Sequence, residues 1–223
     1  MLKLYFHPSP NPFKAALMLE ELQTPYELIA VDMLKGEQHH PAYRQINPNA
    51  KIPALVDADV TVFDSHAILL YLAEKHGRFL PHGRVARAAA LSWLQFVATG
   101  LSPFCGQAVH FLHYAPEPMP YALNRYTKEV DRHYRVLDEH LAQARYLAGD
   151  EYSIADIALW GWANSAGYLF GEKGLSAYPN VQRLVSEIAA RPAVARTLAL
   201  RERLVLKQEF DAEAHRALFP QNV

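Results

Sequence analysis

The chain has 223 residues, enough to bury one large core or two smaller ones. Its 22 basic and 23 acidic residues nearly cancel and no basic block stands out, which argues against nucleic acid and anionic membranes as partners. A single cysteine excludes an internal disulfide framework, and we find neither a signal peptide nor an apolar run of about 18 residues, so we expect a cytoplasmic protein with no membrane span.

Residues 1–32 change from a strand pattern to a helix pattern and back. Apolar residues alternate over 2–6, as in a strand, and the segment Ser9-Pro10-Asn11-Pro12 ends the alternation. Apolar residues then recur on one helix face over 15–22, with Pro12 suited to the first helical position and Asn11 to the N-cap. Residues 26–32 form a second predicted strand.

Residues 33–76 complete a predicted mixed sheet. We expect a loop with one helical turn over 33–49, and then two short strands, 52–56 and 61–63, joined by a hairpin turn. The apolar face of 68–73 predicts a closing helix that ends near Gly77. The strand–helix–strand start predicts parallel pairing, and the hairpin adds an antiparallel edge.

From residue 84 onward the pattern is helical throughout. Apolar residues step by three and four over 91–101, 123–141 and 181–188. The segment 153–170 is apolar nearly all round, which predicts a buried central helix, and its start has the form of a capping box with aspartate in the usual glutamate place. We therefore predict two domains, over 1–78 and 84–223.

The Ile52-Pro53 pair precedes the third predicted strand and follows Lys51, which has no acidic neighbour in the sequence. A bond before proline takes the cis form at a cost of only about 0.5–1 kcal/mol. A cis bond here would turn the N–H and C=O groups of Ile52 outward, where an extended peptide could pair with them. The alternative is a proline that merely sits on an edge strand.

The Asp64-Ser65 pair lies where the strand pattern gives way to the helix pattern, with Ser65 as the expected N-cap. A helix start offers free N–H groups and a positive dipole end to a carboxylate, and an aspartate beside it can hold an ammonium group. A carboxylate and an ammonium on one carbon make up an amino-acid head group. The alternative is that both residues only cap their helix.

Taken together, these segments resemble the cytosolic glutathione S-transferases over essentially the whole chain. The resemblance rests on SPNP, NPNAKIPAL and FDSHAILLYLAEK in the first half and on YSIADIALW in the second. The segment GQAVHFLHYAPEPMPYALNRY, 106–126, is most similar to the bacterial nu class of glutathione-dependent disulfide-bond oxidoreductases.

The resemblance implies a thioredoxin-like N-terminal domain with a four-stranded mixed sheet, an all-helical C-terminal bundle and a homodimer. It implies that the first domain binds glutathione through residues that each meet one part of the tripeptide. The backbone of Ile52, ahead of cis-Pro53, would pair with the cysteinyl unit, Asp64 and Ser65 would hold the γ-glutamyl head, and Gln38 and Lys51 would meet the glycyl carboxylate. Two positions depart from the family pattern, since many relatives have glutamate at Asp64 and glycine at Ala50.

Redox proteins with a thioredoxin-like fold carry Cys-Pro-x-Cys where this chain has Ser9-Pro10-Asn11-Pro12, so the thiol used here would be that of glutathione. The Ser9 hydroxyl, the Asn11 amide and the free N–H groups of the helix start are donors that stabilise a thiolate. We therefore expect Ser9 and Asn11 to be catalytic. Two alternatives are that Asn11 only caps the helix and that Tyr5 activates the thiol instead.

The second half is expected to supply the second-substrate side of a cleft through Gln107, His110 and Phe111. Arg132 is expected to attract a second glutathione or a disulfide, unless it is an ordinary solvated helix arginine. His110-x-x-His113 lacks an acidic or cysteine partner at a suitable spacing, so we expect no metal. Cys105 follows Pro103-Phe104 in apolar surroundings and is expected to be buried and inert.

Three functions are compatible with this pattern. The leading hypothesis is an enzyme that reduces small disulfides with glutathione as co-substrate. The second is a transferase that uses the same thiolate to conjugate glutathione to small electrophiles. The third is a non-catalytic binding module of transferase-like fold, since a fold does not fix a function.

Overall fold

The computed structural model describes residues 1–222, which form two compact units. One unit combines residues 1–72 with the C-terminal segment that starts at Pro192, and the other spans residues 73–191. The two units divide after Leu72, ahead of the predicted boundary at residues 78–84, and the predicted second domain also included the C-terminal segment. That segment instead packs on the first unit through long-range contacts, which a local pattern does not reveal.

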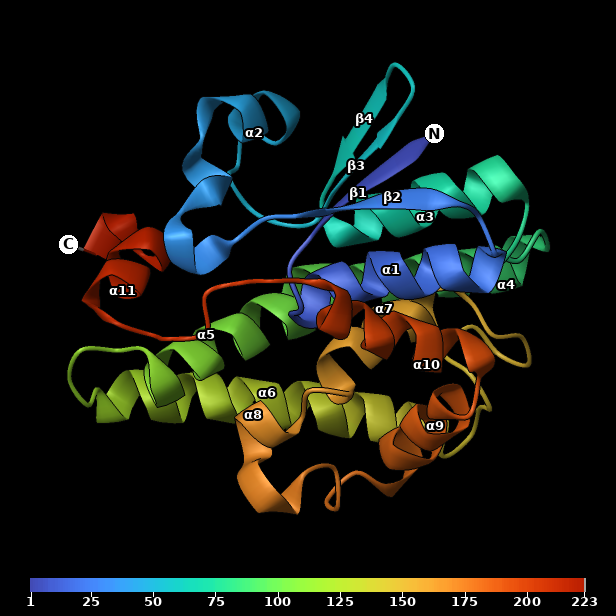
Figure 1. Cartoon of the computed structure of the whole chain (residues 1–223). Coiled ribbons are helices and arrows are strands. Elements are labelled where there is room, and N and C mark those ends of the chain that lie inside the picture. The colour runs from blue at the N-terminus through green and yellow to red at the C-terminus, as the bar shows by residue number, and fades with distance from the viewer. Residues whose placement is uncertain (223) are drawn as a thin grey trace. The chain divides into compact units, whose positions relative to one another are not determined.

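The first unit is built on a four-stranded mixed sheet in the order β2-β1-β3-β4, which confirms the predicted thioredoxin-like topology. Strand β1 (Leu2–Phe6) pairs in parallel with β2 (Tyr26–Ala30) and antiparallel with β3 (Ala54–Asp57). The edge strand β4 (Val60–Phe63) is antiparallel to β3. Helices α1 (Pro10–Leu22) and α3 (Ser65–His76) lie on one face of the sheet (Figure 1).

The connection between β2 and β3 holds more helix than predicted. It contains the 3-10 turns η1 (Met33–Lys35) and η2 (Glu37–His39), followed by α2 (Pro41–Ile46). None of these elements is long enough to show an apolar period, which is why the sequence predicted a loop with one turn.

The C-terminal segment wraps the first unit with four short elements that the sequence did not predict, namely α10 (Pro192–Ala199), η5 (Leu200–Arg203), α11 (Ala212–Leu218) and η6 (Pro220–Asn222). The Arg196 Nε atom lies 2.7 Å from Glu20 Oε2, which joins α10 to α1. Farther along, the Lys207 N–H donates to Asp32 Oδ2 at 2.8 Å. Helix α11 then lies beside η1 (Figure 1).

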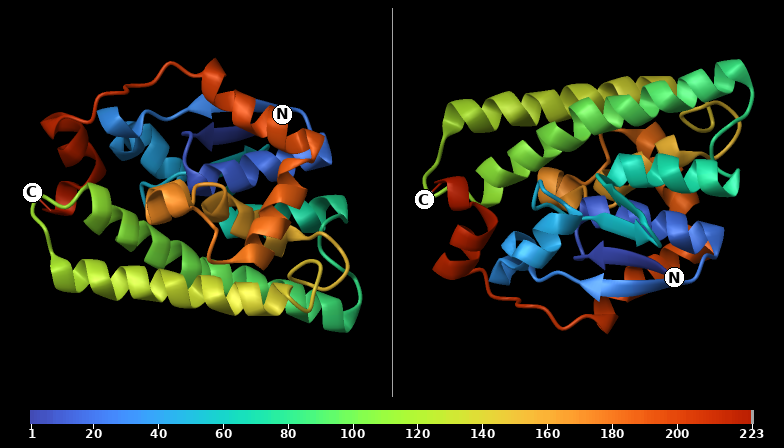
Figure 2. Two further views of the ribbon diagram at one scale, coloured as in Figure 1. Left: turned by 90° about the horizontal axis from the view of Figure 1, so that it is seen from below. Right: turned by 90° about the horizontal axis from the view of Figure 1, so that it is seen from above.

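The second unit is all-helical, as predicted. Helix α4 (Arg84–Phe96) continues through one π turn, η3 (Val97–Leu101), into α5 (Ser102–His113), and the long α6 (Pro120–Leu141) runs alongside them (Figure 2). Every residue of α7 (Ile154–Ala163) is buried, which confirms the predicted central helix, although it ends before the predicted 170. The short α8 (Gly167–Phe170) and η4 (Gly171–Lys173) precede α9 (Pro179–Ala189).

The π turn brings the α4–α5 run close to α6. A side chain in place of the hydrogen of Gly100 would collide with His133 Nε2, so the turn requires glycine at this position. His133 is buried against the rings of Phe96 and Phe104, with centroids 5.0 Å and 5.2 Å away, and its Nδ1 lies 2.7 Å from the Glu129 carbonyl oxygen.

The helical run Arg84–His113 has the length and composition of a membrane span, contrary to the sequence-based expectation that no such run exists. The reason is that the π turn joins α4 and α5 into one helix of 30 residues. Inside the unit this run packs against α6 and α7, as the helices of a bundle do.

A capping box starts α7 and confirms the sequence prediction. Ser153 Oγ accepts from the Ala155 N–H at 3.3 Å, and Asp156 Oδ2 accepts from the Ser153 N–H at 2.8 Å. The other carboxylate oxygen, Oδ1, accepts from the Leu147 N–H at 2.8 Å and so ties the preceding loop to the helix. Burial raises the pKa of Asp156 to about 6, against the lowering effect of these hydrogen bonds. The box therefore anchors two segments of the core at one carboxylate.

We predict that Asp156→Ala lowers the free energy of unfolding by about 2–4 kcal/mol, because it removes one half of the capping box and leaves the buried N–H groups of Leu147 and Ser153 without acceptors. Chemical denaturation with circular dichroism detection measures the change. The control is Asp150→Ala at an exposed position of the same loop, which should alter stability by less than about 0.5 kcal/mol. Equal effects of the two substitutions would contradict the anchoring role.

Candidate functional site

Ser9, rather than Asn11, is the N-cap of α1, and Pro10 rather than Pro12 is its first residue. The prediction of Asn11 as N-cap was therefore wrong. Either proline of Ser-Pro-Asn-Pro fits a first helical turn, and the helix begins at the earlier one. The Ser9 hydroxyl makes no capping hydrogen bond and only a long contact of 3.4 Å with the His7 carbonyl oxygen. It is thus available to a ligand.

The first turn of α1 offers a single main-chain donor. Pro10 and Pro12 have no N–H group, and the N–H groups of Ser9 and Phe13 donate to His7 O at 2.8 Å and Ser9 O at 3.2 Å. Within residues 1–222 the Asn11 N–H has no acceptor. The predicted set of free N–H groups is therefore reduced to this one, beside the Ser9 hydroxyl and the Asn11 amide.

A buried lysine holds the Asn11 side chain. The Lys14 Nζ donates to Asn11 Oδ1 at 2.8 Å, and the lysine side chain is fully buried. The same Nζ lies 3.1 Å from His66 Nε2 on α3. The sequence analysis did not single out Lys14 or His66, although a lysine inside the apolar stretch from Phe13 to Leu19 was a signal that could have been used.

Asp64, rather than Ser65, caps α3. Its Oδ1 accepts from the N–H groups of His66 at 2.8 Å and Ala67 at 3.2 Å, and its backbone has a left-handed φ of 74°. The prediction of Ser65 as N-cap was wrong, because Ser65 is the first helical residue and is buried. The hydrogen bond to the His66 side chain lowers the pKa of Asp64 to about 2, so its exposed carboxylate is charged at neutral pH.

His66 connects the starts of the two helices. Burial, together with the Lys14 charge, lowers the pKa of His66, so the ring is neutral at pH 7. With Lys14 as an ammonium group, which can only donate, we assign Nε2 as the acceptor and place the ring proton on Nδ1. Nδ1 lies 3.4 Å from Asp64 Oδ1. A polar network thus runs from Asn11 through Lys14 and His66 to Asp64.

The Ile52-Pro53 peptide is cis, as the sequence suggested. Ile52 precedes β3, and within the described chain its N–H and C=O groups form no hydrogen bond. The preceding carbonyl, Lys51 O, accepts from Tyr43 Oη and Asn47 Nδ2, both at 2.6 Å, which fixes the loop. The Lys51 side chain is exposed and pairs with no carboxylate of residues 1–222, so it can reach an anionic ligand.

Gln38 is buried, and its Nε2 donates to the Ala217 carbonyl oxygen of α11 at 2.9 Å. No local sequence pattern indicates this contact with the C-terminal segment. Tyr5, the alternative thiol-activating residue, is half-buried in β1 and packs on the ring of Tyr43 at a centroid distance of 5.5 Å. This contact favours a packing role for Tyr5.

The predicted second-substrate residues belong to the helical unit. On α5, Gln107 is exposed while His110 and Phe111 are half-buried, and Phe111 stacks on Tyr126 with centroids 5.4 Å apart. The Arg132 Nε donates to Glu129 Oε2 at 3.0 Å, and Arg125 pairs with the same carboxylate at 2.7 Å. The role of these residues toward a second substrate stays a prediction.

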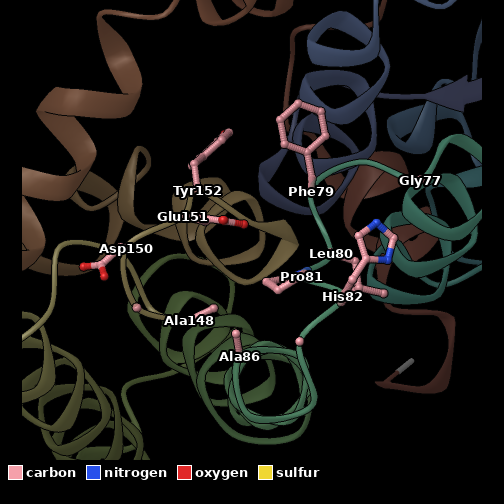
Figure 3. A pocket seen from close by; sticks show the side chains of 12 residues that line it. Gly77, Phe79, Leu80, Pro81, His82, Ala86, Ala148, Asp150, Glu151 and Tyr152 are labelled. Carbon is pink, nitrogen blue, oxygen red and sulfur yellow. The ribbon is translucent and has the colours of Figure 1, made fainter.

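Three further features lie apart from the predicted site residues of the first unit. Among residues 1–222 no group of three or more His, Cys, Asp or Glu side chains is placed to hold a metal ion. Cys105 is fully buried in α5. A cavity of about 570 Å³ in the helical unit is lined by the linker at residues 77–83 and the loop at 148–152, including Phe79, His82 and Tyr152 (Figure 3). None of the predicted site residues lines it.

Comparison with known proteins identifies both halves of the chain. Residues 1–74 match the N-terminal domain of glutathione S-transferases and residues 101–192 match their C-terminal domain. The disulfide-bond oxidoreductase YfcG of Escherichia coli is 46% identical over 89% of this chain and 94% of its own length.

Two solved structures agree with this match. A transferase family member from Pseudomonas fluorescens, with two glutathione molecules bound, has a TM-score of 0.84 and 37% identity over 88% of this chain and 92% of its own. A transferase from Pseudomonas putida, with one glutathione disulfide bound per subunit, has a TM-score of 0.83 and 35% identity. The match covers 88% of this chain and 90% of the Pseudomonas putida chain.

We predict that His66 makes the protein less stable as the pH drops below 6.5, which is the pKa of this histidine in the unfolded chain. The unfolded chain takes up a proton there while the folded chain, in which the pKa is lowered, does not. As the pH is lowered, the free energy of unfolding of wild type should fall more steeply than that of His66→Gln, by up to about 1.4 kcal/mol per pH unit.

Denaturant titrations at pH 7.5, 6 and 5 measure the difference between the two proteins. His82→Gln, at an exposed position, is the matched control and should follow wild type at every pH. Parallel curves for wild type and His66→Gln would show that the ring is not held neutral.

Proposed function

Because the chain belongs to the glutathione S-transferase family, we propose that it reduces small disulfides with the thiolate of bound glutathione. The observation that carries this proposal is the start of α1, where Ser9 and Asn11 present donors and no cysteine is present. The single cysteine of the sequence, Cys105, is buried in α5 of the other unit. A protein thiol is therefore not available for the exchange.

The first unit offers complementary groups for each part of glutathione. Asp64, charged at neutral pH and exposed, suits the γ-glutamyl ammonium group, and the start of α3 at Ser65 suits the adjacent carboxylate. The main-chain groups of Ile52 suit the backbone of the cysteinyl unit. Lys51 suits the glycyl carboxylate, and Gln38, whose Nε2 donates to Ala217 O, is a further amide donor for it.

Thiolate formation is the first step of the proposed reaction. A free thiol has a pKa of about 8.5, and a helix start with hydrogen-bond donors lowers it. The donors available here are the Asn11 N–H, the Asn11 amide and the Ser9 hydroxyl. They would stabilise the charge on the glutathione sulfur, which is the nucleophile in thiol–disulfide exchange.

The exchange then proceeds in two balanced steps. The glutathione thiolate attacks one sulfur of the disulfide, so that a mixed disulfide forms and the other sulfur leaves as a thiolate that takes up a proton. A second glutathione thiolate attacks the glutathione sulfur of the mixed disulfide, which yields glutathione disulfide and the second reduced thiol. Two glutathione molecules supply the two electrons. We propose that Gln107, His110, Phe111 and Arg132 bind the second substrate or the second glutathione.

The relatives support this choice of reaction. YfcG is named a disulfide-bond oxidoreductase, and the two Pseudomonas proteins bind two glutathione molecules or glutathione disulfide. Conjugation of glutathione to an electrophile is the second candidate, because the stacked pair of Phe111 and Tyr126 offers a flat apolar surface. Both candidates need the same thiolate. A non-catalytic module would have no use for donors gathered at one helix start.

We propose further that the protein is a cytoplasmic homodimer. The edge strand β4 exposes the large apolar residues Val60 and Phe63, which is a surface that a second copy of the chain could cover. A single cysteine and no structural disulfide suit a reducing compartment.

We predict robust consumption of NADPH when the protein is mixed with glutathione, glutathione reductase and a small organic disulfide. Asn11→Ala and Ser9→Ala should each lower kcat/KM, by about tenfold or more, because each removes a donor to the thiolate. The matched control is Tyr5→Phe, which keeps the ring packing on Tyr43 and should leave activity nearly unchanged.

Two results would contradict this account. A rate no higher than the uncatalysed one would remove the reductase function, and conjugation of an electrophile would be tested next. A loss greater than tenfold in Tyr5→Phe, with Ser9→Ala still active, would move the activating role from Ser9 to Tyr5.

A further inference from the structure

One lysine side chain of the first unit has no exposed surface. Lys14 is fully buried although it occupies the first turns of α1, one of the helices on the sheet. Lysine is almost never fully buried in proteins, because taking an ammonium group out of water is costly unless hydrogen bonds and charges compensate it. A buried ammonium one turn from a reactive helix start therefore calls for a functional explanation.

Two contacts of Lys14 lead to the two ends of the proposed glutathione site. Its Nζ donates to Asn11 Oδ1 at 2.8 Å on the same helix. It lies 3.1 Å from Nε2 of His66, which directly follows Asp64 and Ser65 at the start of α3. The ammonium thus joins the residue expected at the sulfur to the residues expected at the γ-glutamyl head.

The hydrogen bond to Asn11 fixes the orientation of its amide. An asparagine side chain has one acceptor oxygen and an NH2 group with two donors, and without a partner either end could face a ligand. Because Lys14 occupies the oxygen, the NH2 group must point away from the ammonium. The Asn11 amide is then held with its donors free, as binding to a thiolate requires.

The charge of Lys14 also favours a thiolate at the start of α1. His66 faces the ammonium as a neutral acceptor, and the exposed carboxylate of Asp64, which caps α3, lies beside the other ring nitrogen of His66. A positive charge in low-dielectric surroundings close to the N-terminus of α1 adds to the helix dipole and favours an anion there.

We propose that Lys14 is a positioning residue for catalysis, which orients the Asn11 amide toward the glutathione sulfur and stabilises the thiolate through its buried charge. This inference rests on the proposed use of the glutathione thiolate. Lys14 does not itself touch the reacting sulfur in this account. Its loss should therefore change the ionisation of bound glutathione much more than the affinity for it.

The test is an ultraviolet titration of the thiolate of glutathione bound to wild type, Lys14→Met and Lys14→Gln. Methionine removes both the charge and the donor, whereas glutamine keeps a donor for Asn11 but no charge. We expect the thiol pKa to rise by at least one unit in Lys14→Met, which is a tenfold loss of thiolate at lower pH, and by less in Lys14→Gln. The dissociation constant of glutathione should change less than threefold in both.

Melting temperatures separate this role from a structural one. We expect Lys14→Met to shift the melting temperature by only a few degrees, because the acceptors left on Asn11 and His66 and the removal of a buried charge have opposite effects. Lys3→Met is the matched control, since Lys3 is an exposed lysine of the same unit paired with Glu27, and it should leave the thiol pKa unchanged.

An unchanged thiol pKa in folded Lys14→Met, with or without a lower melting temperature, would overturn the proposal. If Lys14→Met does not fold, Lys14→Gln carries the same comparison, and an unchanged thiol pKa there would overturn the role of the charge. The titration needs binding but no turnover. An inactive wild type whose bound thiol still responds to Lys14 would contradict disulfide reduction while supporting the role of Lys14.

Discussion

Two prolines flank Asn11 in the first turn of α1, and they leave this turn with one main-chain N–H group that the described residues do not bind. Since no cysteine is present there, the turn can stabilise a sulfur anion but cannot provide one. In the proposed reaction the thiol therefore arrives with glutathione. This constraint assigns the proposed chemistry to the donors of Ser9 and Asn11 rather than to a protein nucleophile.

Other residues of the first unit hold the start of α1 and the segments near it in place. Lys14 and His66 connect the first turn of α1 with the capping aspartate of α3. The residues proposed for the sulfur of glutathione and those proposed for its γ-glutamyl head thus belong to one polar network. The C-terminal segment adds a second support, because α11 binds the side chain of Gln38. In the helical unit, the stacked pair of Phe111 and Tyr126 and the exposed Gln107 and Arg132 are the groups that we propose for acceptor specificity.

Much of the fold could be predicted because it depends on local sequence patterns. Apolar residues at every second position indicated the strands of the sheet, and the apolar stretch 153–170 indicated the central helix. The residue types at 153 and 156 indicated the capping box. Both N-cap predictions failed by one or two positions, because Ser9 and Asn11, like Asp64 and Ser65, are all good capping residues and only backbone geometry decides between them. Contacts between distant residues gave no local signal, as with Gln38 and Ala217, which are 179 positions apart, or Lys14 and His66.

The central claim is that the reacting sulfur belongs to glutathione and not to the protein. Intact-mass spectrometry of the enzyme, rapidly quenched with acid during turnover of glutathione and a small disulfide, tests it most directly. We predict that the whole population keeps its unmodified mass, while the mixed disulfide is recovered as a small molecule. A protein species carrying a glutathione or substrate adduct on Cys105 that forms and decays at the rate of turnover would contradict the claim.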